Sequence, residues 1–138
     1  MPSGRLAVVA IGGNSLIQAK DRLSIPNQYE AAALTAHHIA DMIEDSWNVV
    51  VTHGNGPQMG FILRRSELSI HEVSPVPMDY AGADLQGAIG YMFVKAFRNE
   101  FHRRGIRREP VVRSPYSRRS RAGSARARPC ASRGRRRL

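Results

Sequence analysis

Hydrophobic residues follow two different patterns over the first part of the chain. Two short apolar runs, at residues 6–11 and 48–52, end at glycine-containing segments and predict buried strands. Between them, from Pro26 and Asn27 onward, apolar residues recur every three or four positions, which predicts a helix. The stripe consists of Tyr29, Ala32, Ala33, Ala36, Ile39, Ala40, Ile43 and Trp47. This order predicts a βαβ unit whose right-handed crossover makes the strands parallel, with Trp47 in the core.

Two more helical patterns follow the second predicted strand. Pro57 suits the first turn of a helix that continues to Leu68. Residues 70–82 are interpreted as a loop, since Pro75, Pro77 and Gly82 break regular structure. A third helix is expected from about Ala83, ending at a C′ glycine, Gly105. Its apolar stripe is Leu85, Ile89, Met92, Phe93, Ala96, Phe97 and Phe101.

Charge divides the chain into two parts. Residues 1–112 contain 11 basic and 11 acidic residues, whereas residues 113–138 contain 10 arginines and no acid, so the tail carries the whole net charge of +10. Val111 and Val112 look like the start of another strand, but the tail after them has no Val, Ile, Phe, Met or Trp. It cannot bury enough apolar surface to offset the entropy of ordering, and we predict that it is disordered.

The tail has three possible explanations. A run of arginines is most simply a solvated charge run, and it can also bind nucleic acid nonspecifically by neutralising phosphates. The third explanation is that the tail is out of frame or otherwise non-native, because GC-rich DNA read out of frame encodes mainly Arg, Ser, Ala, Pro and Gly. We favour this third interpretation for residues 113–138, which makes residues 1–112 the beginning of a truncated domain. The nucleotide sequence after the codon for Val112 would decide.

Features of the sequence favour a cytoplasmic protein that does not enter membranes. No apolar stretch approaches the roughly 20 residues that a membrane-spanning helix needs. The N-terminus lacks the charged-then-apolar arrangement of a signal peptide. Cys130 is the single cysteine, so no internal disulfide can form, and it has no neighbouring histidine that would make it catalytic.

A glycine cluster follows each predicted strand. Carboxyl ends of parallel strands meet at one edge of a sheet, where α/β proteins bind ligands. Glycine lets backbone amides approach an anion closely, and a helix beginning after the second cluster adds its positive end. Either cluster alone is as easily a tight turn, and neither has Walker A or dinucleotide-binding spacing. Together they predict a phosphate site formed by Gly12, Gly13, Asn14, Gly54, Asn55 and Gly56.

Other polar residues are weaker candidates. His37 and His38 are adjacent on a helix, point in different directions, and are expected to have a surface or packing role. His53 flanks the second glycine cluster, where a positioning role is favoured over acid–base chemistry. Asp79 and Asp84 could pair as carboxylates, but capping of the helix expected near Ala83 is favoured.

Three blocks of sequence closely resemble carbamate kinase, a member of the amino acid kinase family. They are V-V-A-I-G-G-N-S-L at 8–16, V-V-V-T-H-G-N-G-P-Q-M-G at 49–60 and P-M-D-Y-A-G-A-D-L-Q-G-A-I-G-Y-M at 77–92. The resemblance covers about residues 6–112. It implies a three-layer α/β/α sandwich with a mainly parallel sheet, of which this chain holds the first third or so.

The resemblance also implies an activity. Carbamate kinases transfer phosphate reversibly between ATP and carbamate, making carbamoyl phosphate, with magnesium, in arginine catabolism, and intact relatives look like homodimers. In the family the two glycine clusters hold carbamate or carbamoyl phosphate and the transferring phosphoryl group. The family's catalytic lysines come from later segments, and after residue 112 this chain has no lysine and no aspartate.

These departures set the expected function of this chain. Its catalytic residues are unknown, metal ligands and the ATP half are missing, and we expect it to be inactive alone. Leu85 stands where the family usually has Thr or Ser before Gln-Gly, a small departure that concerns the fine geometry of the loop expected at this block. The alternatives are a phosphate-site remnant without turnover, and a small nucleic-acid-associated protein acting through its tail.

Overall fold

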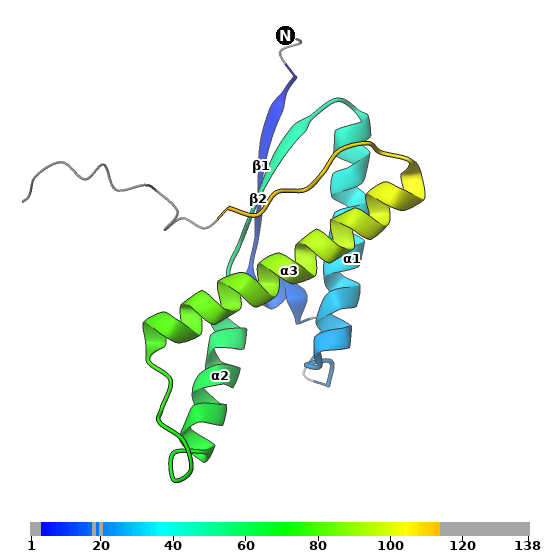
Figure 1. The fold of residues 1–138 in the computed structure, drawn as a ribbon. Helices are drawn as coiled ribbons and strands as arrows, with labels where there is room; N and C mark the ends of the chain where they lie inside the picture. Colours follow the sequence, from blue (N-terminus) through cyan, green and yellow to red (C-terminus); the bar gives the residue numbers. More distant parts are fainter. Residues whose placement is uncertain (1–3, 18, 20, 114–138) are drawn as a thin grey trace, which may run out of the picture.

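The computed structural model describes residues 4–17, 19 and 21–113. The elements are, in chain order, β1 (Leu6–Ile11), a short 3-10 helix η1 (Gly13–Leu16), α1 (Ile25–Glu44), β2 (Asn48–His53), α2 (Gly56–Leu68) and α3 (Met78–Arg104). Figure 1 shows the two strands side by side, with α3 crossing α1. The predictions for residues 114–138, including Cys130, lie outside the described residues.

The two strands form a parallel sheet, as predicted. Leu6 is paired with Asn48 at one end and Ile11 with His53 at the other. Val9, Val49 and Val51 pack against the helical core, whereas the side chains between them face outward. The outward-facing Val8 and Val50 are 66% and 48% exposed, so burial of both faces of the strands is not found. The α/β class is confirmed, and the described residues form the sheet and the helices on one of its faces.

The first helix begins and packs as its sequence suggests. Ser24 is the N-cap, and its Oγ accepts a hydrogen bond from the backbone N–H of Asn27 at 3.3 Å. Ala32, Ala36 and Ala40 have no exposed surface, and such small side chains let α3 come close. The prediction for Trp47 is wrong: it lies beyond the end of α1, half-buried and outside the core cluster, with the Arg5 guanidinium 5.5 Å from its ring centroid.

The third helix begins five residues earlier than predicted. Its N-cap is Pro77, in an extended conformation, and Gly82 lies inside the helix. Two prolines end the preceding loop, but a proline at the N-cap loses no intrahelical hydrogen bond, so the helix can begin directly after it. The capping role expected for Asp79 and Asp84 near Ala83 is therefore wrong. Asp79 lies in the first turn, where its charge favours the helix dipole, and Gly105 ends the helix in the left-handed conformation, as predicted.

The strand expected to begin at Val111 is not found in the part of the chain that the structure describes. Residues 106–113 have no regular secondary structure, and Val111 and Val112 are 77% and 53% exposed. Val112 lies against α3: a Cβ placed on Gly90 would be 3.3 Å from Val112 Cγ1. Val112 thus contacts α3 instead of beginning a strand.

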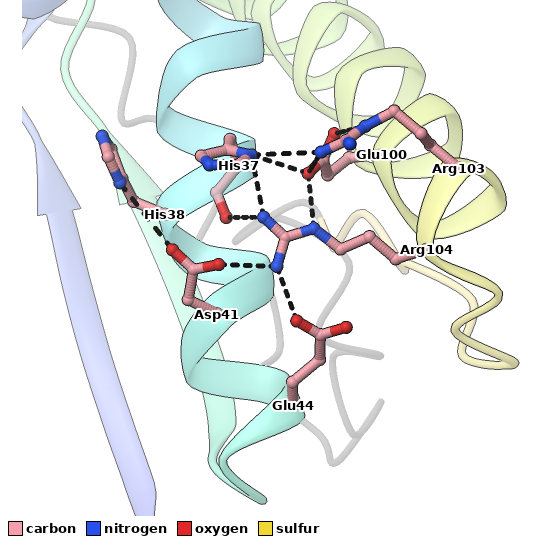
Figure 2. A network of polar contacts seen from close by, with 7 residues as sticks. All are labelled: His37, His38, Asp41, Glu44, Glu100, Arg103 and Arg104. Carbon is pink, nitrogen blue, oxygen red and sulfur yellow. Dashed lines mark hydrogen bonds and ion pairs between the residues drawn. The ribbon is translucent and has the colours of Figure 1, made fainter.

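A polar network joins α1 to α3 (Figure 2). At its centre Arg104, whose side chain is 11% exposed, donates to Glu100 Oε1, Asp41 Oδ1 and Glu44 Oε2, each at 2.6 Å. Arg104 Nη2 also donates to the backbone oxygen of His37 at 3.0 Å. The His37 side chain is 45% exposed and its Nδ1 lies 2.9 Å from Glu100 Oε1, which agrees with the expected surface or packing role, while His38 points elsewhere, toward Asp41 at 3.9 Å.

None of the helices among the described residues is long and apolar enough to cross a membrane.

Candidate functional site

The two glycine clusters meet at the carboxyl edge of the sheet. The backbone N–H of Gly54 donates to Ile11 O at 2.8 Å, so the loop after β2 starts beside the end of β1. A Cβ added to Gly54 would be 3.1 Å from Gly13 N. A Cβ added to Gly13 would be 3.0 Å from both Gly56 N and Pro57 Cδ. The prediction that both clusters lie at one edge is confirmed, and their backbones are in direct contact.

The first glycine cluster is held in place by the buried side chain of Leu16 at the end of η1. Gly12 is extended and η1 begins at Gly13, with Ser15 N–H donating to Gly12 O at 2.9 Å. Leu16 follows with 1% exposure, which fixes the end of η1 in the core. Gly12 and Asn14 stay exposed to solvent. The polar part of the loop is therefore accessible on a rigid support.

The second cluster leads directly into α2. The helix begins at Gly56, with Pro57 in its first turn, where a missing N–H costs no hydrogen bond. Asn55 is the N-cap residue, but its side chain makes no capping hydrogen bond. The unpaired amides and positive dipole end of α2 therefore lie next to Gly13, an arrangement that favours anions.

Two buried glutamines beneath the loops were not foreseen. Gln28 in α1 and Gln58 in α2 are each 5% exposed. Gln58 Nε2 donates to Gln28 Oε1 at 3.1 Å and to Gly13 O at 3.4 Å. Gln28 Nε2 donates in turn to Leu23 O at 2.9 Å. In the sequence, each glutamine lies near the beginning of its helix, and Gln58 also lies in the block at 49–60 that resembles carbamate kinase. Neither signal reveals the contact between the two glutamines.

A cavity of about 1290 Å³ adjoins the second cluster. It lies between β2, α3 and residues 108–113, and Asn55, His53 and Gln86 line it. The His53 ring stacks on Phe93, with ring centroids 6.3 Å apart. His53 Nδ1 and Gln86 Nε2 are buried without a hydrogen-bond partner among the described residues. Both residues line the cavity, but these two atoms are themselves buried.

The lysine and the acidic side chains among the described residues do not gather at the two glycine clusters. Lys95 is the single lysine among the described residues, and its ammonium nitrogen is 4.8 Å from the ring centroid of Tyr29. The described residues contain no group of three or more His, Cys, Asp or Glu side chains placed to hold a metal. Asp79 and Asp84 occupy successive turns of α3.

The strongest electrostatic effect belongs to the network between α1 and α3. Hydrogen bonds from Arg103, and then from Arg104 and His37, lower the pKa of Glu100 to about 2, although partial burial opposes the shift. A hydrogen bond from Arg104 likewise holds the pKa of Asp41 below its usual value. The residues of this network belong to neither glycine cluster. We therefore interpret the network as a structural link between α1 and α3.

Comparison with known proteins finds relatives that are named carbamate kinase. The chain is 45% identical over 107 residues to a carbamate kinase of Pyrococcus horikoshii, covering 76% of this chain and 34% of that protein. It is 43% identical over 103 residues to a carbamate kinase of Clostridium perfringens, covering 72% and 32%. The chain thus spans about a third of the length of these relatives. No protein-family model matches it.

Solved structures give the same result for the fold. A carbamate kinase of Giardia lamblia bound to AMP-PNP superposes with a TM-score of 0.72 at 33% sequence identity. The match covers 80% of this chain and 38% of that one. Both comparisons therefore point to the same proteins, over most of this chain and a minor part of theirs.

Proposed function

Since this chain is homologous to carbamate kinases over about three quarters of its own length, we propose that its two glycine clusters form the carbamoyl-phosphate-binding part of a carbamate kinase site. The observation that carries the proposal is the direct contact between Gly13 and the loop Gly54–Gly56 beside the positive end of α2. The substrates would be carbamate and ATP in one direction, and carbamoyl phosphate and ADP in the other. Homodimer formation and a role in arginine catabolism remain predictions.

The proposed mechanism uses the chain mainly for binding and electrostatics. Phosphoryl transfer depends largely on positioning and on stabilisation of charge on the transferring group. Backbone amides of the two clusters, other than that of Gly54, which donates to Ile11 O, and the side-chain amides of Asn14 and Asn55 would donate to the phosphoryl oxygens. In the forward direction a carbamate oxygen forms the new bond to phosphorus while the bond to the ADP oxygen breaks. The chain holds the acceptor in place for that step.

The described residues do not fit the nucleotide and magnesium part of the site. They contain one lysine, engaged with Tyr29, and no acidic cluster able to hold a metal. ATP and magnesium would therefore have to be bound by segments that correspond to the other two thirds of the relatives. We propose that the 138-residue chain is inactive by itself.

A turnover assay tests this proposal. The purified 138-residue chain is expected to form no ATP from ADP and carbamoyl phosphate above background. A chimera that joins residues 1–112 to the remaining two thirds of the Clostridium perfringens relative should regain magnesium-dependent turnover, because the glycine clusters would then face a complete nucleotide site. Turnover by the isolated chain, or a folded chimera that binds ADP without turnover, would contradict the proposal.

A further inference from the structure

We propose that Gln58 is a positioning residue that sets the orientation of the Gly13–Asn14 peptide, so that the Asn14 N–H points toward bound phosphate. This inference rests on the proposed function of the glycine clusters. It concerns a residue in the interior that would act on the ligand only through the backbone of the first loop.

The contact that carries the inference is made to a peptide oxygen. Gln58 Nε2 lies 3.4 Å from Gly13 O, which belongs to the same rigid peptide unit as the N–H of Asn14. In a trans peptide the C=O and N–H point in opposite directions. A donor that holds Gly13 O toward the interior therefore turns the Asn14 N–H outward, to the side where Gly12 and Asn14 are exposed.

Gly13 is the first residue of η1, and its peptide lies at the end of that short helix, where a side-chain contact can add support. It has no side chain to pack, and glycine has more backbone freedom than any other residue. A side chain there is excluded by Gly56 N and Pro57 Cδ, each 3.0 Å from the position of a Cβ. The close contact between the clusters thus requires a residue without a side chain. The buried amide of Gln58 restricts the backbone freedom that glycine brings to this position.

Gln58 is itself held from a second helix. Its Nε2 donates to Gln28 Oε1 at 3.1 Å, and Gln28 Nε2 donates to Leu23 O at 2.9 Å. Both side chains are 5% exposed, so water competes little for these hydrogen bonds. The chain of amides joins the segment before α1, α1 itself, α2 and the first glycine cluster.

The arrangement is poorly explained by stability alone. Gln58 Oε1 is buried and has no hydrogen-bond partner among the described residues. An unsatisfied buried acceptor is destabilising, and an apolar side chain of similar shape would avoid it. The placement of Gln58 Nε2 between Gly13 O and Gln28 Oε1 therefore points to control of the loop.

The test compares Gln58→Met with a matched control in the full 138-residue chain. Ser66 is 8% exposed, and its Oγ accepts from Val76 N–H at 2.7 Å, so Ser66→Ala also removes a partly buried hydrogen bond, but at the far end of α2. Carbamoyl phosphate is titrated, and the Asn14 amide resonance is followed by NMR. Gln58→Met should weaken binding about tenfold, the size expected for loss of one orienting hydrogen bond, and shift the Asn14 resonance even without ligand. Ser66→Ala should change neither.

Different failures are distinguishable. If the wild-type chain does not bind carbamoyl phosphate, the proposed function fails, whereas the Asn14 resonance still reports whether Gln58 orients the peptide. Unchanged affinity and an unchanged Asn14 resonance in Gln58→Met would overturn the inference. If Gln58→Met does not fold, Gln28→Met provides the test: it removes the support behind Gln58 and should weaken binding about threefold with the same Asn14 shift, whereas no change in either would overturn the inference.

Discussion

Gly13→Ala is expected to lower the free energy of unfolding by about 1–3 kcal/mol, the usual cost of forcing an extra carbon into a packed region, and to abolish binding of carbamoyl phosphate. The added Cβ would lie 3.0 Å from Gly56 N and Pro57 Cδ and 3.2 Å from Asn55 N. Two of these three atoms belong to backbone amides, which cannot rotate away as a flexible side chain would. The clusters must separate, and with them the amides proposed to hold the phosphate.

Gly87→Ala is the matched control. Gly87 lies within α3, and a Cβ added there meets no atom within 4 Å. Because alanine is the better helix former, this variant should be as stable as wild type or up to about 1 kcal/mol more stable, with unchanged binding. Urea unfolding followed by circular dichroism gives both values. A Gly13→Ala variant as stable as Gly87→Ala would show that the two loops are not in close contact.

Acid is expected to weaken the junction between α1 and α3. Glu100 Oε1 accepts hydrogen bonds from Arg103 and Arg104, and lies 2.9 Å from His37 Nδ1. These contacts lower the pKa of Glu100 from 4.5 to about 2. Because the folded-state pKa is below the unfolded one, the stabilisation is complete above pH 4.5 and is lost as the pH falls toward about 2. Asp41, whose pKa is also lowered, adds to the loss in the same direction.

Glu100→Gln separates this carboxylate from the others. The variant should be clearly less stable than wild type at neutral pH, because Arg103 and Arg104 lose a shared charged acceptor that is 12% exposed. The difference in stability should shrink toward zero as the pH approaches 2. Glu67→Gln is the control, since Glu67 is 66% exposed and its pair with Arg64 should contribute little. Thermal unfolding across the pH range measures both, and parallel curves for wild type and Glu100→Gln would contradict this role.

Local patterns in the sequence were sufficient to predict the parallel strands and the meeting of the glycine clusters. Strand runs that end at glycine are signals within a few residues, and the geometry of a βαβ unit places their ends together. The buried stripe on α3 from Leu85 to Phe101 was also predictable from the sequence, because the helical spacing of apolar residues does not depend on where the helix begins. Its beginning at Met78 was missed because Pro75, Pro77 and Gly82 suggest a loop, yet a proline N-cap and a glycine inside a helix are both tolerated.

Contacts between residues far apart in sequence were not predictable. Helical spacing puts Asp41 near His37, and Arg104 near Glu100, but nothing in either segment says that the two helices meet at these positions. The same holds for Gln28 and Gln58, which are 30 residues apart and come together only because α1 and α2 both begin beside the first glycine cluster. Such pairs depend on tertiary packing.

Titration of the ¹⁵N-labelled 138-residue chain with carbamoyl phosphate tests the central claim most directly. The amides of Gly12, Gly13, Asn14, Gly54 and Gly56 should shift together along one saturable curve. They should do so at high salt as well, where nonspecific attraction to the ten arginines of residues 113–138 is screened. Shifts confined to those arginines, or lost on adding salt while the glycine amides stay unchanged, would contradict the account.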